Sequence, residues 1–363
     1  MSNKMFVRCT FASFLWLLML LSVCGCEHRP LLSMELPENT FVRVYFDEHI
    51  RNVSYGFYDE AKKKPEYYSP QMMRVVFCDE ASGRVVTERY LHDSGKDERG
   101  YYIQGLLNVP DGRYNMMAYN FDTQYTKIRN QNDYSTMTAY TKPLTSEEAN
   151  RIFGSRGDVE NYEIISKQPD HLFVAKVEGV EVSSDGYKEH PDTIMTEQKT
   201  HPVAQTIVKT YYLQISVVGV EYVRSAVALL SGMSGSKTMH DGKMVANDVT
   251  SVYFGLNNGK EKNRATNEET LATVAYATFN TFGKLPSEEN DLEITFEFNI
   301  INNTVQTETF RITDMFETPE VRDNQWIIID KVIMIDPPNG EDTGGGMTPG
   351  VSDWEEIEGK ITI

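Results

Sequence analysis

The side chains that most often carry out catalysis or bind metals are present in this sequence, but their spacing favours neither role. Seven histidines are spread along the chain, and none forms His-x-His, His-Glu-x-x-His or a cluster with cysteine at the spacing of a metal site. The chain also lacks Gly-x-Ser-x-Gly, the sequence that places a nucleophilic serine on a sharp turn. Carboxylates are plentiful, but no pair stands out as an acid and a base. We therefore predict a protein that is not an enzyme, with no catalytic residue, no metal and no cofactor.

Residues 231–238 contain the small and hydroxyl side chains of a phosphate-binding loop, in the order Ser-Gly-Met-Ser-Gly-Ser-Lys-Thr. The similarity fails at Ser236, which stands where such a loop needs the glycine that precedes its lysine. A flexible hairpin loop explains the segment better, because glycine and serine are common in turns.

The N-terminus has the layout of a bacterial secretory signal. Lys4 and Arg8 precede an apolar run over residues 11–23, and the sequence Cys-Gly-Cys follows at residues 24–26. The run is shorter than the roughly 20 residues that span a bilayer, so a permanent transmembrane helix is the weaker interpretation. Lipoprotein signal peptidase favours a small residue before the modified cysteine, which selects Cys26 as the lipidation site. The remaining alternative is ordinary cleavage nearby, which would leave a soluble periplasmic protein.

The cysteines agree with a signal peptide over residues 1–25 and a lipid on Cys26, where more than one acyl chain would make anchoring stable. Cys9 and Cys24 leave with the signal, so Cys78 has no partner and a disulfide framework is excluded. Cys78 lies in an apolar stretch, and a buried hydrophobic role suits it better than a reactive thiol.

The charge balance is strongly acidic, with 53 Asp and Glu against 35 Lys and Arg and a formal net charge of -18. Removing Lys4 and Arg8 with the signal peptide lowers this charge by two, to -20. Nucleic acid is therefore not expected as a partner. Attraction to anionic lipid is disfavoured in the same way, so attachment to a membrane should depend on the acyl chains alone. The mature chain exceeds one typical domain, which favours two.

Alternation of apolar and polar residues with a period of two predicts β-strands in both halves of the chain. After a polar tether over residues 26–39, strand patterns fill residues 40–182, which we predict to form the N-terminal β-sandwich. Its clearest hairpin consists of residues 101–109 and 113–121 around Pro110-Asp111-Gly112, where proline presets φ and glycine accepts a positive φ.

One helix is expected within this first sandwich, from Thr145 to Gly154. Thr145 and Glu148 form a capping box at its start, and Gly154 provides a stop. Residues 183–202 lack apolar periodicity and contain two His-Pro dipeptides, so we predict a linker between the domains.

Residues 203–336 are predicted to form the C-terminal β-sandwich. Residues 292–300 give the strongest strand signal in the chain, because Leu, Ile, Phe, Phe and Ile alternate with polar residues. Residues 326–335 are apolar on both faces in part, which predicts a central strand, and the sequence Asp-Pro-Pro ends it.

The chain ends in a segment that is separated from this domain. Residues 337–350 are rich in glycine and proline and predict a flexible linker, and residues 351–363 predict one more strand. The candidate subunit-contact residues of this terminal strand are Trp354, Ile357, Ile361 and Ile363. The strand can fold back onto its own sheet, or it can add to the sheet of another molecule, where main-chain hydrogen bonds give affinity and alternate side chains give specificity.

Several stretches resemble one known family. They are the lipoprotein signal ending in Cys26, Val109–Asn120, Tyr211–Val220, Val227–Met233 and the tail that contains Trp354. Together they resemble Bacteroidales fimbrillin-like lipoproteins, in particular a domain-of-unknown-function group related to the FimB- and Mfa-type anchor proteins of type V pili. The resemblance covers nearly the whole chain and implies an all-β fold of two tandem transthyretin-like (Greek-key) β-sandwich domains. It also implies a lipid anchor in the cell outer membrane, exposed at the cell surface, and subunits joined by β-strand addition.

In such pili an arginine-specific protease trims the polymerising subunits, whereas anchor subunits keep their lipid. Arg43 and Arg51 lie in or near the first strand here, but nothing marks either as a processing site. The resemblance therefore implies an anchor or accessory subunit, with fimbrial subunits and the outer membrane as its partners.

Two further features concern glycans. Tyr and Phe are abundant, so a surface glycan-binding lipoprotein is the alternative function, although aromatic residues more often fill sandwich cores. Asp192-Thr193-Ile194 resembles the O-glycosylation sequon of exported Bacteroidetes proteins, which makes Thr193 a candidate modification site.

Overall fold

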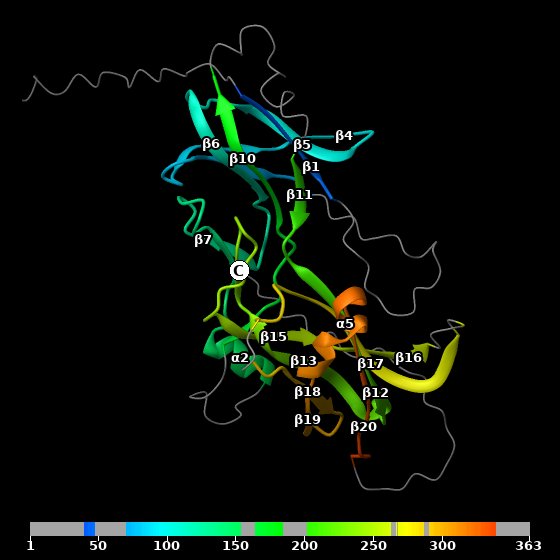
Figure 1. The fold of residues 1–363 in the computed structure, drawn as a ribbon. Coiled ribbons are helices and arrows are strands. Elements are labelled where there is room, and N and C mark those ends of the chain that lie inside the picture. Colours follow the sequence, from blue (N-terminus) through cyan, green and yellow to red (C-terminus); the bar gives the residue numbers. More distant parts are fainter. Residues whose placement is uncertain are drawn as a thin grey trace, which may run out of the picture. The chain divides into compact units, whose positions relative to one another are not determined.

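The computed structural model describes residues 40–47, 70–153, 164–183, 202–262, 266, 268–286 and 290–338. Within these ranges the strands form packed sheets and the helices are short, which confirms the predicted all-β sandwich fold (Figure 1). No helix in these ranges is long and apolar enough to cross a membrane.

An eight-stranded sheet forms the body of the first half of the chain. Its strands, in spatial order, are β3 (Val85–Leu91), β2 (Met73–Asp79), β6 (Gly112–Asn120), β10 (Phe173–Val182), β11 (Val203–Thr206), β1 (Thr40–Phe46), β5 (Gly100–Leu107) and β4 (Asp93–Asp97). Strands far apart in this order share one core; for example, Leu91 of β3 lies against Gly105 of β5. The alternation of apolar residues that predicts β1 is confirmed, since Val42 and Val44 are fully buried in this core.

The strands predicted on either side of Pro110 are present, but they do not form a hairpin. β5 pairs with β1 and β4, whereas β6 pairs with β2 and β10. The turn therefore carries the chain from one part of the sheet to another, and across it the Tyr114 hydroxyl donates to the Pro110 carbonyl at 2.8 Å. The prediction was wrong because local residues specify only that the chain turns. The choice of partner strand depends on residues far away in the sequence.

Two sheets pack face to face in the second half of the chain. One sheet has the order β16 (Asn257–Lys262), β17 (Glu269–Thr281), β12 (Lys209–Val218) and β20 (Trp326–Met334). The other has the order β19 (Val305–Arg311), β18 (Glu293–Ile300), β13 (Val223–Ser234), β15 (Val249–Gly255) and β9 (Ile165–Ser166). The strand predicted over residues 292–300 is confirmed as β18, whose Phe296 and Phe298 are fully buried. Across the core, the rings of Phe254 and Phe279 stack with centroids 4.1 Å apart.

Short elements connect the two halves of the chain. β8 (Thr138–Thr141) pairs with β7 (Thr126–Arg129) and with β14 (Ser236–Thr238), and β9 joins the second half by pairing with β15. β11, which lies just beyond the predicted linker, pairs with β1 and β10. Strands from residues 40–182 and from residues 203–336 thus pair with one another, and the boundaries of the two domains stay a prediction.

The helix predicted in the first half is present as α2 (Ser146–Phe153). Its capping box is formed, since the Thr145 N–H donates to Glu148 Oε2 at 2.8 Å and the Glu148 N–H donates to Thr145 Oγ1 at 3.2 Å. The hydrogen bond from the Thr145 main chain lowers the pKa of Glu148. Among the described residues, the other helical elements are η2 (Val220–Tyr222), η3 (Thr313–Glu317) and α5 (Pro319–Asn324), which are too short to show a helical period in the sequence.

Residues 231–238 form the end of β13 and all of β14, so the prediction of a hairpin loop was wrong. Their small side chains serve close packing instead of a turn. A Cβ atom on Gly235 would lie 2.7 Å from a carboxylate oxygen of Asp248, and the same carboxylate accepts a hydrogen bond from the Ser236 hydroxyl.

Candidate functional site

The functional residues predicted from the sequence lie outside the described ranges. They are the lipidation site, the glycosylation site and the contact residues of the terminal strand: Cys26, Thr193, Trp354, Ile357, Ile361 and Ile363. All of them stay predictions. Within the described ranges, no group of three or more His, Cys, Asp or Glu side chains is placed to hold a metal ion. The surfaces that remain to be considered there are strand edges and pockets.

The strand β20 offers an edge to which another polypeptide could add. It pairs in parallel with β12, and no described strand pairs with its other side. Among the described residues β20 is the last strand of its sheet, and its place in the sheet of the full chain stays a prediction. Both faces of β20 carry apolar side chains. Ile327 and Ile329 enter the core, while Ile328 packs against Tyr212 on the outer face of the sheet.

A bulge divides this edge in two. Ile215 of β12 pairs with Ile329, and the next residue, Ser216, pairs with Val332, so Asp330 and Lys331 are left over in β20. Both of these charged side chains are exposed. Bulges and charges on an edge strand oppose unplanned pairing with other chains. A regular edge is therefore present only on either side of the bulge.

The end of β20 beyond the bulge carries exposed apolar side chains, which we call the β20 end patch: Val332, Met334 and the neighbouring Val218 of β12. Val332 is 57% exposed and Met334 is 60% exposed, and the register places Val218 beside Met334. The Gln306 side chain on β19 donates to the Met334 carbonyl at 2.8 Å, so an incoming strand would have to replace that bond. Exposed apolar surface of this kind is typical of protein contacts.

Arg43, one of the two arginines in or near the first strand, is held inside β1. The strand pairs with β5 from Thr40 to Tyr45, and Arg43 Nε donates to Gln104 Oε1 at 2.8 Å. The guanidinium lies 4.2 Å from the centroid of the Tyr102 ring, and a hydrogen bond with Tyr45 raises the pKa of Arg43. Proteases cleave exposed, loosely held segments, so this geometry opposes cleavage at Arg43. The other arginine, Arg51, lies outside the described ranges.

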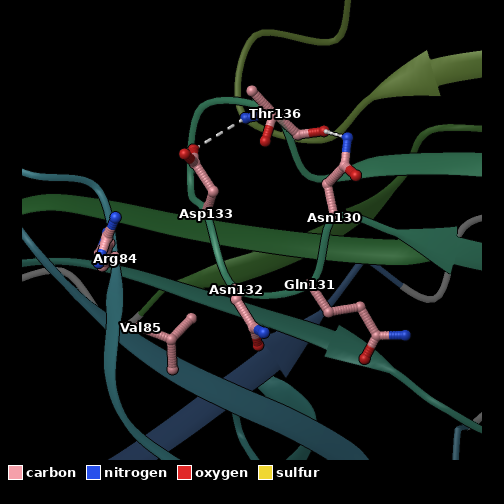
Figure 2. A pocket seen from close by; sticks show the side chains of 7 residues that line it. All are labelled: Arg84, Val85, Asn130, Gln131, Asn132, Asp133 and Thr136. Atoms are coloured by element: carbon pink, nitrogen blue, oxygen red, sulfur yellow. Dashed lines mark hydrogen bonds between the residues drawn. The ribbon is translucent and has the colours of Figure 1, made fainter.

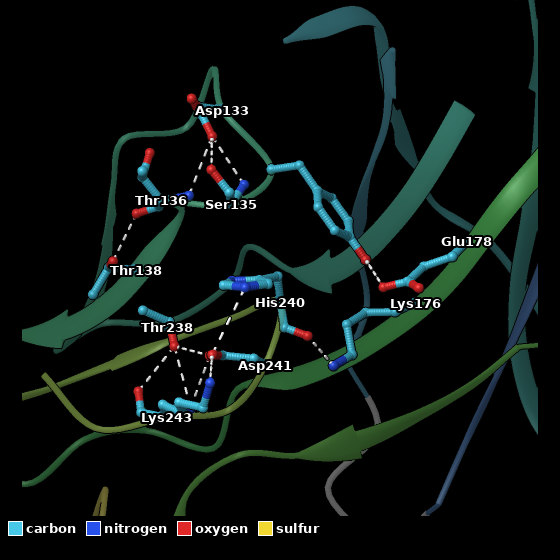
Figure 3. Close-up of polar contacts among 11 residues, drawn as sticks. Asp133, Ser135, Thr136, Thr138, Lys176, Glu178, Thr238, His240, Asp241 and Lys243 are labelled. Carbon is cyan, nitrogen blue, oxygen red and sulfur yellow. Dashed lines mark hydrogen bonds and ion pairs between the residues drawn. The ribbon is translucent and has the colours of Figure 1, made fainter. Parts of the chain in front are cut away.

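Separate polar contacts tie the loop after β7 and the segment that follows β14 to strand β10 (Figure 3). The Tyr134 hydroxyl donates to Glu178 Oε1 at 3.3 Å, and Lys176 Nζ donates to the main-chain carbonyl of His240. Burial would raise the pKa of Asp241, but hydrogen bonds within its own turn outweigh burial and lower the pKa. The carboxylates of these contacts already have partners in the fold. These hydrogen bonds therefore serve to hold chain segments together, and they do not form a catalytic acid–base pair.

Cys78 is the buried hydrophobic residue that its apolar surroundings predict. Its side chain is fully buried in a cluster that includes Val76 and Met117. Burial raises the pKa of the Cys78 thiol to about 12, so almost no thiolate is present at neutral pH.

We expect Cys78 to resist alkylation by iodoacetamide in the native protein and to react readily after unfolding in guanidinium chloride. The reason is that both solvent access and the thiolate form appear only when the cluster opens. Peptide mapping by mass spectrometry, with and without denaturant, measures the modified fraction at Cys78. Equal rates of modification in the two conditions would contradict the buried environment.

The chain is similar to proteins of the Bacteroidales along most of its length. Residues 25–255 match the family described as Domain of unknown function (DUF5119). A Bacteroides ovatus protein described as "Putative fimbrium anchoring subunit Fim4B" is 24% identical over an alignment of 373 positions that covers 96% of this chain and 97% of the relative.

Two solved structures illustrate the structural likeness. A "putative adhesin" from Bacteroides ovatus is 22% identical, with 86% of this chain and 98% of that chain covered and a TM-score of 0.49. The fimbrial anchor protein Mfa2 from Porphyromonas gingivalis is 16% identical, with 70% of this chain and 77% of that chain covered and a TM-score of 0.36. The family match at residues 25–255 spans more than half of the chain, and the protein therefore belongs to the DUF5119 family.

Proposed function

We propose that the protein is a fimbrial anchor or accessory subunit that lipid on Cys26 holds at the outer membrane, with its sandwiches at the cell surface. The observation that carries this proposal is the similarity to the Bacteroides ovatus fimbrium anchoring subunit, which extends over 96% of this chain instead of over one domain. Several acyl chains on one cysteine would make the attachment stable, since each buried methylene contributes about 0.8 kcal/mol. With such an anchor, attachment of this acidic protein to the membrane does not require electrostatic attraction to lipid.

In this proposal, strand addition joins the protein to other subunits. In the predicted terminal strand over residues 351–363, a period of two would put the isoleucines at positions 357, 361 and 363 on one face and polar residues at positions 358, 360 and 362 on the other, with Trp354 on the second face. A strand with this pattern gains main-chain hydrogen bonds along an open sheet edge and buries one row of apolar side chains. On this subunit, the β20 end patch is where a strand from a partner would add.

Two variants test the anchor and the joint separately in cells that express the partner fimbrial subunits. Replacing residues 1–26 by a secretory signal without a lipidation cysteine should move the protein out of the membrane fraction while the subunits still co-purify with it. Deleting residues 351–363 should have the opposite result, because the lipid remains and the joint is lost. Mass spectrometry of the mature N-terminus shows the acyl chains directly.

A matched pair of substitutions tests whether one face of the terminal strand makes the contact. Ile361→Glu should reduce the recovered subunits at least ten-fold, whereas Thr362→Glu, one residue along and on the opposite face, should leave recovery unchanged. Circular dichroism monitors the fold of each variant. The proposal fails if the N-terminus carries no lipid, if the two substitutions act equally, or if deleting residues 351–363 unfolds the protein. Unfolding would mean that the strand completes its own domain.

A further inference from the structure

A polar cavity opens between the turn before β3 and the loop after β7 (Figure 2). Its volume is about 710 Å³. It is lined by one cation, one carboxylate, three amides, one hydroxyl and one aliphatic side chain: Arg84, Asp133, Asn130, Gln131, Asn132, Thr136 and Val85. Side chains of these types offer many donors and acceptors in a small space, which suits a ligand rich in hydroxyl groups.

Hydrogen bonds within the protein hold both sides of the cavity in place. The Val85 N–H donates to the Asn132 carbonyl at 3.1 Å, which ties the loop to the start of β3. Asn130 has a left-handed φ of +56°, and its side-chain amide donates to the Thr136 carbonyl at 3.2 Å (Figure 2). Asparagine adopts this left-handed conformation more readily than most residues, and the hydrogen bond to Thr136 holds the loop in that shape.

Two exposed side chains of the cavity, the guanidinium of Arg84 and the carboxamide of Asn132, have no hydrogen bond or ion pair with other described side chains and are free to meet a ligand from solvent. The other members are engaged. Gln131 accepts a hydrogen bond from Arg74, and Asp133 Oδ1 accepts from Ser135. A guanidinium binds a carboxylate through two parallel hydrogen bonds, and a carboxamide both donates to and accepts from hydroxyl groups. The available groups therefore select a ligand that carries a carboxylate next to hydroxyl groups.

An exposed aromatic pair lies near the end of β3 that is away from the cavity. Tyr90 of β3 is 41% exposed and Phe121, just after β6, is 44% exposed, and their ring centroids are 5.3 Å apart at an interplanar angle of 63°. Met72 is exposed beside them, and its carbonyl accepts from the Phe121 N–H at 3.4 Å. Contiguous exposed apolar side chains on a soluble domain mark a binding surface. Tyrosine adds a hydroxyl group to that surface.

The aromatic pair and the cavity are parts of one surface. Tyr90 pairs with Arg74 across β3 and β2, and Arg74 donates to Gln131, which lines the cavity, and to Glu88, two residues from Tyr90. Tyr90 lies five positions after Val85 along β3, which corresponds to roughly 16 Å at the rise of a β-strand. That length suits an oligosaccharide better than a single sugar.

We propose that this surface binds an oligosaccharide whose terminal sugar carries a carboxylate. Neutral sugar rings rest on Tyr90 and Phe121, and the acidic sugar enters the cavity, where its carboxylate meets Arg84 and its hydroxyl groups meet Asn132. The cavity offers one cation, Arg84, and also holds the carboxylate of Asp133, so it suits a ligand with a single carboxylate better than a polyanionic chain. This site goes beyond the anchoring role and would allow the subunit to contact glycans.

Isothermal titration calorimetry of the purified full chain tests the site, with 3′-sialyllactose as a probe that ends in one carboxylated sugar and lactose as its neutral counterpart. Sialyllactose should bind at least ten-fold more tightly than lactose. Arg84→Gln should remove this preference and leave lactose binding unchanged, whereas Tyr90→Ala should weaken both. Asn132→Asp, which introduces a like charge next to the carboxylate, should weaken sialyllactose alone. Arg322→Gln, at an exposed arginine of α5, is the control and should bind as the unchanged protein does.

The proposal is overturned if sialyllactose shows no saturable binding, if it binds no better than lactose, or if Arg84→Gln keeps the preference. Co-purification of the fimbrial subunits should be the same for Arg84→Gln and the unchanged protein. Loss of the subunits in this variant would instead make the cavity a protein contact. Failure of the glycan site and failure of the strand-addition joint are therefore distinguishable.

Discussion

Replacing Gly219 by alanine is expected to destabilise the second sandwich and to loosen the end of β20. Gly219 follows β12 with a φ of +86°, and an added Cβ atom would lie 2.4 Å from the main-chain oxygen of Ile335. That oxygen cannot move away freely, because the Ile335 N–H donates to the Val218 carbonyl at 2.9 Å. Left-handed strain alone costs roughly 1–3 kcal/mol. With the clash added, the free energy of unfolding should fall by more than about 2 kcal/mol.

Urea denaturation measures this loss, and Gly255→Ala is the matched control. Gly255 ends β15, where an added Cβ atom would meet nothing within 4 Å and no left-handed φ is required. Its substitution should change the free energy of unfolding by less than about 0.5 kcal/mol. Hydrogen exchange should show faster exchange of the Ile335 amide only in Gly219→Ala. Equal stabilities of the two variants would contradict the close approach of β12 and the end of β20.

The features that sequence predicts well here are those that short-range physics decides. The alternation over residues 292–300 must bury one face wherever the strand lies, and β18 buries it. The capping box of Thr145 and Glu148 satisfies the first main-chain donors of a helix from within the helix itself, and α2 begins there. Cys78 is buried because its neighbours in sequence are apolar, whatever strand they pair with.

The sequence does not reveal which strands pair with one another. Pro110-Asp111-Gly112 makes a turn in any context, yet β5 and β6 pair with different strands. Residues 326–335 are apolar on both faces in part, yet β20 is the last strand of its sheet among the described residues, and Ile328 packs against Tyr212 of the neighbouring β12. Neither fact can be derived without the positions of distant residues. The same limit applies to functional surfaces that distant segments build together.

The cavity next to β3 illustrates that limit. Its three amides and its carboxylate come from four consecutive polar residues, 130–133, which in a sequence indicate only a loop. Arg84 lies far from them in the chain and reaches the cavity because the Val85 N–H bonds the Asn132 carbonyl. Tyr90 and Phe121 are likewise ordinary strand residues by pattern. Only their shared exposure in the structure separates them from the aromatic residues that fill the cores.

Phe279→Ala is expected to cause the largest loss of stability among these substitutions, about 3–5 kcal/mol in the free energy of unfolding. Phe279 is 1% exposed, and its ring stacks on Phe254 at an interplanar angle of 1° and lies 5.8 Å from the Tyr211 ring. These rings belong to both sheets of the second sandwich, so the cavity left by alanine cannot close by the movement of one strand alone. Denaturation in urea, followed by circular dichroism, measures the change.

Leu271 provides the matched control, because it lies on the same strand, β17, but is 96% exposed. Leu271→Ala should change the free energy of unfolding by less than about 0.5 kcal/mol. Just beyond β17, Phe282 belongs to a cluster with Met117 and Tyr119 of β6, so damage to the second core should reach the first half of the chain. Phe279→Ala should therefore still unfold in one transition, shifted to lower urea, with the buried Cys78 becoming reactive in that same transition. If Cys78 stayed protected after the second sandwich had unfolded, the two halves would be independent, and the strand pairs that connect them would contribute little to stability.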